Sequence, residues 1–346
     1  MNPEAINHCP CTLAGGFNTY SPRALQLLFD RKKVSHMLDF NAPKLDEEVA
    51  EKLRQNSKII SISGAQFKQS LVLDRNRLRL TEPGEPGRYI LKPVPFNPPF
   101  GKEEELPANE HLTMQIARQV YGMEVAVCAL VFFRNGEPAY ITRRFDYAPN
   151  GGKIAQEDFA ALSGKSKQQD GDGYRNSGSY EDIAILMRKY VPAYAVEIEK
   201  FFGRVVFNYL FSNGDAHLRN FSLQQTQSGD YLLSPAYDLI DTSIHIPADS
   251  FFALTGGLFA NDYETDSFAS LGFYAYDDFY EFGLRIGMLE SRVRTLLEMF
   301  RKENPGVPAL IRASFLSEPV KRLYESHYAD RLRMLNHSFS RKIEAP

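Results

Sequence analysis

Three side chains with the chemistry for phosphoryl transfer occur close together in the sequence. Asp215, His217 and Asn220 lie within six residues, directly after an apolar run over 195–211. A carboxylate at the first position can accept the proton of a hydroxyl nucleophile, and an amide oxygen five residues later can bind a hard cation such as Mg²⁺. This Asp-x4-Asn spacing is that of a kinase catalytic loop. Taken alone, the same residues also fit an ordinary turn after a helix.

Three further charged side chains could complete such a site. Asp238 follows Asn220 by 18 residues, past an expected hairpin, and could be a second Mg²⁺ ligand. Lys92 ends an expected strand, where it could reach the ATP phosphates, and Glu110 in the next helix could pair with it. Each of these residues alone also fits a surface charge or a turn. Their order along the chain is that of the parts of a kinase-like phosphotransferase.

A turn of small residues precedes these groups. Residues 61–66 (SISGAQ) stand between two expected strands, and backbone N–H groups in such a turn can bind phosphate. We therefore assign Ser63, Gly64 and Ala65 to the nucleotide. The turn has one of the three glycines of the G-x-G-x-x-G pattern, and the sequence contains no G-x-x-x-x-G-K-[ST] P-loop.

The expected secondary structure changes in character along the chain. Apolar runs such as 88–92 and 125–133 predict strands, and Pro107 begins an expected helix that continues to about Val120. The run over 195–211 is apolar nearly all round, which predicts a buried helix. The sequence thus predicts an α/β (α+β) protein. Its expected divisions are a short N-terminal segment over 1–55, a β-rich lobe over 56–146 and a helical lobe over 147–346.

Composition narrows the class of protein. The 346 residues carry 40 Lys and Arg against 43 Asp and Glu, so the formal net charge is −3 and predicts no general polyanion-binding surface. Three cysteines cannot form a disulfide framework and fit a reducing compartment. The sequence shows neither a secretory leader nor an apolar stretch of membrane-spanning length. We therefore expect a cytoplasmic protein with no membrane partner.

Taken together, these segments resemble the HipA family of serine/threonine kinase toxins. The resemblance runs from about residue 58 to about residue 335, and the segment over 213–222 is its most specific part. The matching segments are 61–68 (SISGAQFK), 90–93 (ILKP), 109–110 (NE), 144–146 (RFD), 213–222 (NGDAHLRNFS) and 234–239 (SPAYDL). The resemblance implies a bilobal, protein-kinase-like fold that transfers the γ-phosphoryl group of ATP to a serine or threonine hydroxyl.

The resemblance also implies a role for each matched residue. Asp215 would be the catalytic base, and His217 would lie near the phosphates. Asn220 and Asp238 would hold Mg²⁺, and Lys92 would contact the ATP phosphates.

Other matched residues would serve the nucleotide pocket and its regulation. Tyr237 and Phe145 would line the pocket, and the segment around Arg143 would be the hinge to adenine. In this family a serine of the glycine-rich loop is an autophosphorylation site that switches the kinase off. Ser61 is the aligned position, and Ser63 offers a second hydroxyl. A phosphate at either serine would oppose ATP binding through its charge.

Three departures from the family pattern are visible. Arg143 replaces a usual Glu at the start of the hinge, and Phe67 replaces a usual Glu or Pro. About 55 residues precede the loop, whereas full-length members carry an additional N-terminal subdomain, so the chain resembles a short, HipT-like form. Cys9-x-Cys11 matches half of a zinc-like motif of some short members. With His8 it offers three ligands where structural Zn²⁺ needs four, so we expect a metal-free remnant.

The resemblance implies partners as well. The family's known substrates are aminoacyl-tRNA synthetases, and its usual partner is a helix-turn-helix antitoxin, so DNA contact would be only indirect, through that antitoxin. In some short systems the missing subdomain is a separate small protein. Two alternatives stay open: a pseudokinase that binds nucleotide without turnover, which Arg143 allows, and a small-molecule kinase, which shares the Asp-x4-Asn spacing.

Overall fold

A computed structural model of the chain describes residues 5–42, 67–96, 98, 100–148, 151–246 and 250–340. The predicted phosphate-binding turn, with Ser61, Ser63, Gly64 and Ala65, lies outside the described residues. The chain forms two compact units. Unit 1 contains residues 1–151, 244–246 and 305–324, and unit 2 contains residues 152–243, 247–304 and 325–346.

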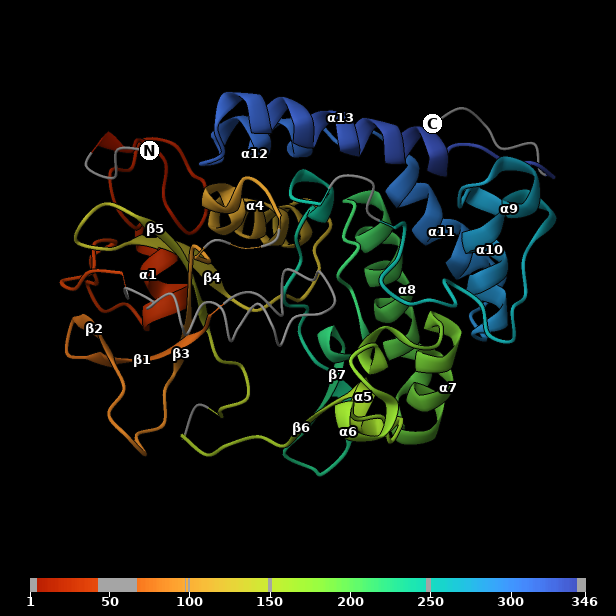
Figure 1. Cartoon of the computed structure of the whole chain (residues 1–346), viewed down its shortest axis with the longest axis horizontal. Helices are drawn as coiled ribbons and strands as arrows, with labels where there is room; N and C mark the ends of the chain where they lie inside the picture. Colours follow the sequence, from red (N-terminus) through yellow and green to blue (C-terminus); the bar gives the residue numbers. More distant parts are fainter. Residues whose placement is uncertain are drawn as a thin grey trace. The chain divides into compact units, whose positions relative to one another are not determined.

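Unit 1 is built on a five-stranded antiparallel sheet (Figure 1). The strands are, in spatial order, β2 (Arg77–Leu80), β1 (Gln69–Asp74), β3 (Tyr89–Pro93), β5 (Pro138–Arg143) and β4 (Cys128–Phe132). The predicted strands over 88–92 and 125–133 correspond to β3 and β4. β4 and β5 pair around a turn that contains Asn135 and Gly136, residue types that favour tight hairpins.

The two faces of this sheet pack against different segments. Alternate strand residues such as Leu91 and Ile141 face a core formed with the N-terminal segment and helix α1 (Pro22–Phe29). Because side chains alternate along a strand, their neighbours Lys92 and Tyr140, which pair in register, point to the opposite face. Helix α4 (Leu106–Gln119) packs against β4 and β5. The sequence pattern of β3 therefore places a lysine on a buried face.

Helix α4 is enclosed by its surroundings, which explains its many buried polar residues. Twelve of its 14 residues are buried. Helix α12 (Gly306–Ala313) and the 3-10 turn η2 (Glu103–Glu105) contact it, as does the segment that contains His245. The helix was predicted over 107–120, and only its surroundings were unexpected, because they come from distant parts of the chain.

Unit 2 is mostly helical. It contains α5 (Phe159–Leu162), α6 (Lys167–Asp170), η3 (Tyr174–Asn176), α7 (Tyr180–Tyr190), α8 (Tyr194–Leu210), η4 (Leu218–Asn220), α9 (Asp266–Leu271), α10 (Tyr276–Arg285), α11 (Glu290–Arg301) and the C-terminal part of α13 (Glu318–Leu335). The turn η5 (Thr242–Ile244) begins in this unit. A three-stranded antiparallel sheet has the order β6 (Gln156–Asp158), β7 (Ser222–Gln225) and β8 (Tyr231–Leu233).

Helix α8 is the centre of unit 2. It is the helix predicted over 195–211, and side chains such as Phe201, Phe202 and Val205 are fully buried. It packs against α7, α11 and β8. The helix ends at Leu210, and Ser212 then takes a positive φ of 50°, which turns the chain sharply into the loop over 213–220. A rigid buried helix thus carries the residues that the sequence singles out for chemistry.

Among the helices of the described ranges, none combines the length and the apolar character that crossing a membrane requires.

The buried His111 of α4 predicts a loss of stability in mild acid. Its Nε2 lies 3.1 Å from the carbonyl oxygen of Cys11, and the side chain is shielded from solvent. Burial lowers the pKa of this imidazole from 6.5 to about 4. Between these values the unfolded chain binds a proton that the folded chain does not. The free energy of unfolding is therefore highest above pH 6.5 and falls as the pH approaches 4.

We expect the change from pH 7.5 to pH 5.5 to lower the free energy of unfolding by roughly 1 kcal/mol through His111 alone. The variant His111→Gln keeps an N–H donor and cannot titrate, so its stability should depend less on pH by about that amount. Urea denaturation at the two pH values, followed by circular dichroism, measures the difference. An identical pH dependence in both proteins would contradict the prediction.

Candidate active site

In unit 1, Lys92 and Glu110 form a buried ion pair. The Lys92 Nζ lies 2.6 Å from the Glu110 Oε1, and each side chain is 4% exposed. The Lys92 ammonium also lies 5.2 Å from the centre of the Tyr140 ring. A buried charge is costly unless it is paired, and loss of one partner costs about 3–5 kcal/mol. The structure therefore brings together the lysine that the sequence assigned to the phosphates and the glutamate expected to pair with it.

The residues around Glu110 hold α4 in place. The Asn109 Nδ2 lies 2.9 Å from the His245 Nε2. One turn later, the Thr113 hydroxyl bonds to the Asn109 carbonyl oxygen at 3.0 Å and lies 2.8 Å from the Tyr324 hydroxyl. Burial lowers the pKa of His245 to about 4, so the imidazole is neutral at physiological pH. Glu110 is thus held on a helix that other buried hydrogen bonds fix.

In unit 2, hydrogen bonds within the loop bring Asp215 and Asn220 close together. The Asn220 Nδ2 donates to the Asp215 carbonyl oxygen at 2.7 Å. The His217 N–H donates to the same oxygen at 2.8 Å. Both Asp215 and Asn220 are less than 10% exposed. Since the Asn220 nitrogen serves the loop, its Oδ1 is the atom that can act as a cation ligand.

His217 is a buried imidazole whose ring nitrogens have no hydrogen-bond partner within the described part of the chain. Its Nε2 lies 3.9 Å from the Asp215 Oδ1, which is beyond hydrogen-bonding distance. Burial, and then the nearby positive charge of Arg175, lower the pKa of His217 to about 3. A buried polar group without a partner costs about 1–3 kcal/mol. A neutral ring beside a carboxylate, with both nitrogens unused, fits a site that receives a polar ligand.

Asp238 stands in a strained backbone conformation. Its φ of 54° is in the left-handed region, which costs a residue other than glycine roughly 1 kcal/mol. The Asn213 Nδ2 contacts its carbonyl oxygen at 3.4 Å. The negative charge of Asp238 also acts on His217, where it opposes the lowering of the pKa. Strain of this kind often accompanies functional sites, and here it occurs at the predicted second carboxylate.

These residues fit an ATP–Mg²⁺ complex. Mg²⁺ usually takes only one or two protein oxygen ligands and completes its shell with water and phosphate oxygens. Asn220 and Asp238 offer that number. Within the described ranges, no group of three or more His, Cys, Asp and Glu residues is arranged to hold a metal ion. The unused ring nitrogens of His217 and the ammonium of Lys92 are suited to phosphate oxygens.

Two residues assigned to the adenine pocket, Tyr237 and Arg143, bond to other residues of the protein. The Tyr237 hydroxyl lies 2.9 Å from the Arg219 carbonyl oxygen and 3.1 Å from the Ser222 hydroxyl. The Arg143 guanidinium forms a 2.7 Å ion pair with Asp30, and Phe145 is half-buried two residues later.

Backbone hydrogen bonds also engage the hinge. The N–H groups of Arg143 and Arg144 donate to the Val127 and Arg88 carbonyl oxygens, both at 2.9 Å. A nucleotide bound at the hinge would therefore have to form its hydrogen bonds with atoms other than these two N–H groups.

Cys9 and Cys11 belong to the core of unit 1, where both are fully buried. The Ser21 backbone N–H donates to the Cys9 Sγ at 3.2 Å, and the Ser21 hydroxyl caps α1. The pair thus packs the N-terminal segment against the first helix.

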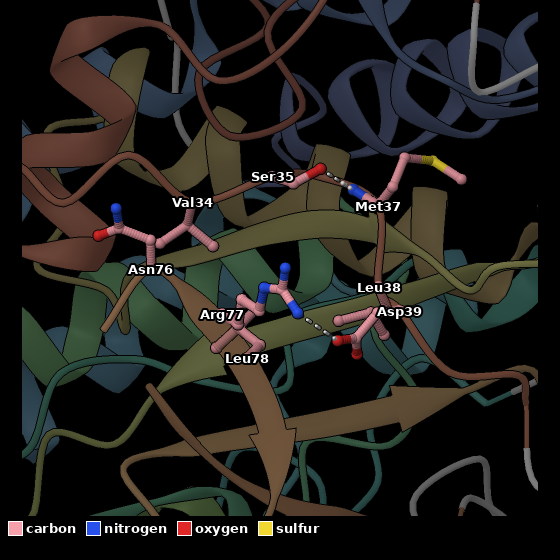
Figure 2. Close-up of a pocket in the computed structure, with 8 residues that line it drawn as sticks. All are labelled: Val34, Ser35, Met37, Leu38, Asp39, Asn76, Arg77 and Leu78. Atoms are coloured by element: carbon pink, nitrogen blue, oxygen red, sulfur yellow. Dashed lines mark hydrogen bonds and ion pairs between the residues drawn. The ribbon is translucent and has the colours of Figure 1, made fainter. Parts of the chain in front are cut away.

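A pocket that the sequence did not predict lies beside the turn between β1 and β2 (Figure 2). Its volume is about 250 Å³, and its lining residues are Val34, Ser35, Met37, Leu38, Asp39, Asn76, Arg77 and Leu78. The Arg77–Asp39 ion pair at its rim is 3.8 Å long and largely exposed, so it contributes little stability. None of the lining residues belongs to the predicted site.

Sequence reasoning missed three residues that act on the catalytic loop. Arg175 influences His217 from the turn η3, whereas Asn213 and Thr242 bond to the loop directly. Asn213 stands inside the motif over 213–222, so its position was visible, but no role was assigned to it. Nothing in the local pattern around Arg175 or Thr242 distinguishes them from surface residues.

Comparisons with known proteins identify relatives of this chain. A putative kinase of Haemophilus influenzae is 29% identical over 330 residues, which cover 92% of each chain. A second putative kinase, from Sinorhizobium fredii, is 31% identical over 228 residues, which cover 62% of this chain and 53% of that relative.

A solved structure shows the fold. The chain is similar to HipA from the Shewanella oneidensis complex of HipA, HipB and operator DNA, with a TM-score of 0.59 and 20% identity. The match covers 85% of this chain and 72% of that one. This likeness confirms the predicted kinase-like α/β fold class. The family model described as the HipA-like C-terminal domain matches residues 60–304. Since this match covers well over half of the sequence, the chain belongs to the HipA-like C-terminal domain family.

Proposed function

We propose that the chain is a HipA-type kinase that transfers the γ-phosphoryl group of ATP to a serine or threonine hydroxyl of a protein. The observation that carries the proposal is the loop of unit 2, in which the Asn220 side chain bonds to the Asp215 carbonyl oxygen at 2.7 Å. This bond holds a carboxylate and an amide oxygen at the two ends of one short loop. Family membership and relatives called putative kinases support the same reaction.

Each residue has a defined task in this reaction. Asp215 accepts the proton of the acceptor hydroxyl while the hydroxyl oxygen bonds to the γ-phosphorus and the bond to the leaving ADP oxygen breaks. Asn220 and Asp238 hold Mg²⁺, which neutralises charge on the phosphates when it is bound. His217 is neutral, so it can donate one ring N–H to a phosphate oxygen without repelling a cation.

Lys92 acts on the same nucleotide as a positive charge. Its ion pair with Glu110 fixes the ammonium, and the low exposure of both side chains removes the screening by water. The two groups of residues therefore have complementary tasks: Lys92 binds phosphate oxygens, and the residues of the unit 2 loop bind the metal ion and the hydroxyl group.

The proposal extends to partners and regulation. The S. oneidensis HipA structure contains HipB and operator DNA. This supports a helix-turn-helix antitoxin as partner, with DNA contact through that antitoxin. We further propose an aminoacyl-tRNA synthetase as substrate, control by autophosphorylation of Ser61 or Ser63, and a separate small protein as a further partner. These proposals rest on the resemblance of the sequence.

The first test compares the wild-type protein with Asp215→Asn. Both are treated with phosphatase, incubated with ATP and Mg²⁺, and analysed by intact mass and phosphopeptide mapping. We expect phosphate on Ser61 or Ser63 of the wild type, and a rate at least a hundredfold lower in the variant because the general base is lost. Asp230→Asn, at an exposed turn, is the matched control and should keep the wild-type rate.

The other outcomes of this test separate the alternatives. ATP binding without phosphate transfer in the wild type would indicate a pseudokinase. Phosphorylation of small hydroxylated compounds, but of no protein, would indicate a small-molecule kinase. Wild-type rates in Asp215→Asn would contradict the assignment of the base.

A second prediction separates the stabilising role of the Lys92–Glu110 pair from its role in the reaction. Lys92→Met and Glu110→Gln each leave a buried charge or polar group without its partner. We expect both to lower the melting temperature and to reduce the kinase rate at least tenfold. The double variant Lys92→Met/Glu110→Leu removes both charges, so it should recover stability.

The kinase rate of the double variant distinguishes a role in the reaction from a purely stabilising role. We expect its kinase rate to stay as low as that of Lys92→Met, although its melting temperature returns toward that of the wild type. If the rate recovers together with stability, the pair has only a structural role.

A further inference from the structure

The catalytic loop and the segment after β8 are joined by a set of buried hydrogen bonds. We propose that Asn213 and Thr242 are positioning residues that fix the catalytic Asp215 relative to the metal-binding Asp238. These two residues are called the loop strap below. The inference rests on the proposed kinase function and adds residues to which that function gave no role.

Asn213 connects the two carboxylate-bearing residues through one amide group. Its Oδ1 accepts the Asp215 backbone N–H at 3.2 Å. Its Nδ2 contacts the Asp238 carbonyl oxygen at 3.4 Å and donates to the Asn208 Oδ1 at 2.9 Å. The side chain is 1% exposed, so water does not compete for these bonds. One amide therefore bonds to the backbone of the base, to the backbone of the metal ligand and to helix α8.

Thr242 makes the second connection, four residues after Asp238. Its hydroxyl accepts the Gly214 N–H at 2.8 Å and donates to the Ser212 carbonyl oxygen at 2.9 Å. Its backbone N–H donates to the same Ser212 oxygen at 3.0 Å. The side chain is fully buried. The residues on both sides of Asn213 are thus bonded to Thr242.

Helix α13 bonds to the residues that precede Asn213 and Thr242 in the sequence. The Arg331 Nε donates to the Ser212 hydroxyl at 3.2 Å, and its guanidinium lies 4.5 Å from the centre of the Phe251 ring. The His327 Nδ1 lies 2.8 Å from the Oδ2 of the buried Asp241, next to Thr242. The loop strap is therefore connected to two long helices, directly to α8 and through Ser212 and Asp241 to α13. The side chains that make these connections are buried or partly buried.

The physical need for this arrangement follows from the strain at Asp238. A residue with a φ of 54° relaxes to an extended or helical conformation unless its surroundings prevent it. Such a change would move the carboxylate away from the metal ion. Since Asn213 bonds to the carbonyl group of Asp238 itself, we infer that it helps to maintain the strained state. A shift of about 1 Å between a base and a metal ion can cost a hundredfold in rate.

The test uses nucleotide binding as well as activity. The affinity for ATP is measured by calorimetry with and without Mg²⁺ for the full chain and for Asn213→Ala, Thr242→Val and Thr242→Ser. The ratio of the two affinities reports how well Asp238 and Asn220 hold the metal ion. Valine has the shape of threonine without its hydroxyl, and serine keeps the hydroxyl. Phosphate incorporation into the protein and melting temperature are measured in parallel.

We expect Asn213→Ala and Thr242→Val to reduce both the Mg²⁺-dependent gain in ATP affinity and the kinase rate by about tenfold or more. Their affinity for ATP without Mg²⁺ should stay at the wild-type value. Thr242→Ser should behave like the wild type. Thr265→Ala, which removes the N-cap of α9, should lower the melting temperature without changing the effect of Mg²⁺.

Two results would overturn the inference: a wild-type Mg²⁺ effect in both Asn213→Ala and Thr242→Val, or equal losses in Thr242→Ser and Thr242→Val. If Asn213→Ala does not fold, the comparison of Thr242→Val with Thr242→Ser still tests the inference. A failure of the kinase proposal itself is distinguishable, because the wild-type protein would then transfer no phosphate to protein, whereas the effect of Mg²⁺ on ATP affinity could still be compared among the variants.

Discussion

The hydrogen bond from the Asn220 side chain to the Asp215 carbonyl oxygen is the interaction on which the candidate site depends. It is 2.7 Å long and lies in a buried loop, so it holds the Asn220 amide group against the backbone of Asp215 on the same short segment. Without it, the Asp-x4-Asn spacing would be only a feature of the sequence. The loop in turn depends on α8, whose buried apolar side chains fix the point where it begins.

The site carries groups that oppose stability. His217 is buried without a hydrogen-bond partner in the described residues, Asp238 has a left-handed backbone, and Lys92 and Glu110 have lost their water. Each costs free energy, so the rest of the fold must compensate through burial. Within each unit, burial restricts these side chains to few conformations, and phosphoryl transfer depends on such positioning of its groups.

Much of this arrangement was predictable from local sequence. The apolar pattern of α8, the strand that ends at Lys92 and the helix that carries Glu110 follow from periodicity and breaker residues. The pairing of Lys92 with Glu110 followed from the order of the parts. Other features depend on distant contacts: Arg175 acts on His217, Thr242 bonds to the loop, and α12 joins the first unit. The sequence around these residues does not indicate which distant segments they contact in the fold, so periodicity could not predict these contacts.

The proposed kinase reaction requires that Lys92 and the metal-binding residues of unit 2 act on one nucleotide. Labelling with an acyl-phosphate derivative of ATP, which transfers its acyl group to a lysine near the phosphates, tests this most directly when the labelled peptide is identified by mass spectrometry. We expect that Lys92 is labelled, that ATP with Mg²⁺ prevents the labelling, and that Asp238→Ala reduces it strongly. Labelling of other lysines instead, or labelling of Lys92 that does not change in Asp238→Ala, would contradict the binding of one nucleotide by both groups of residues.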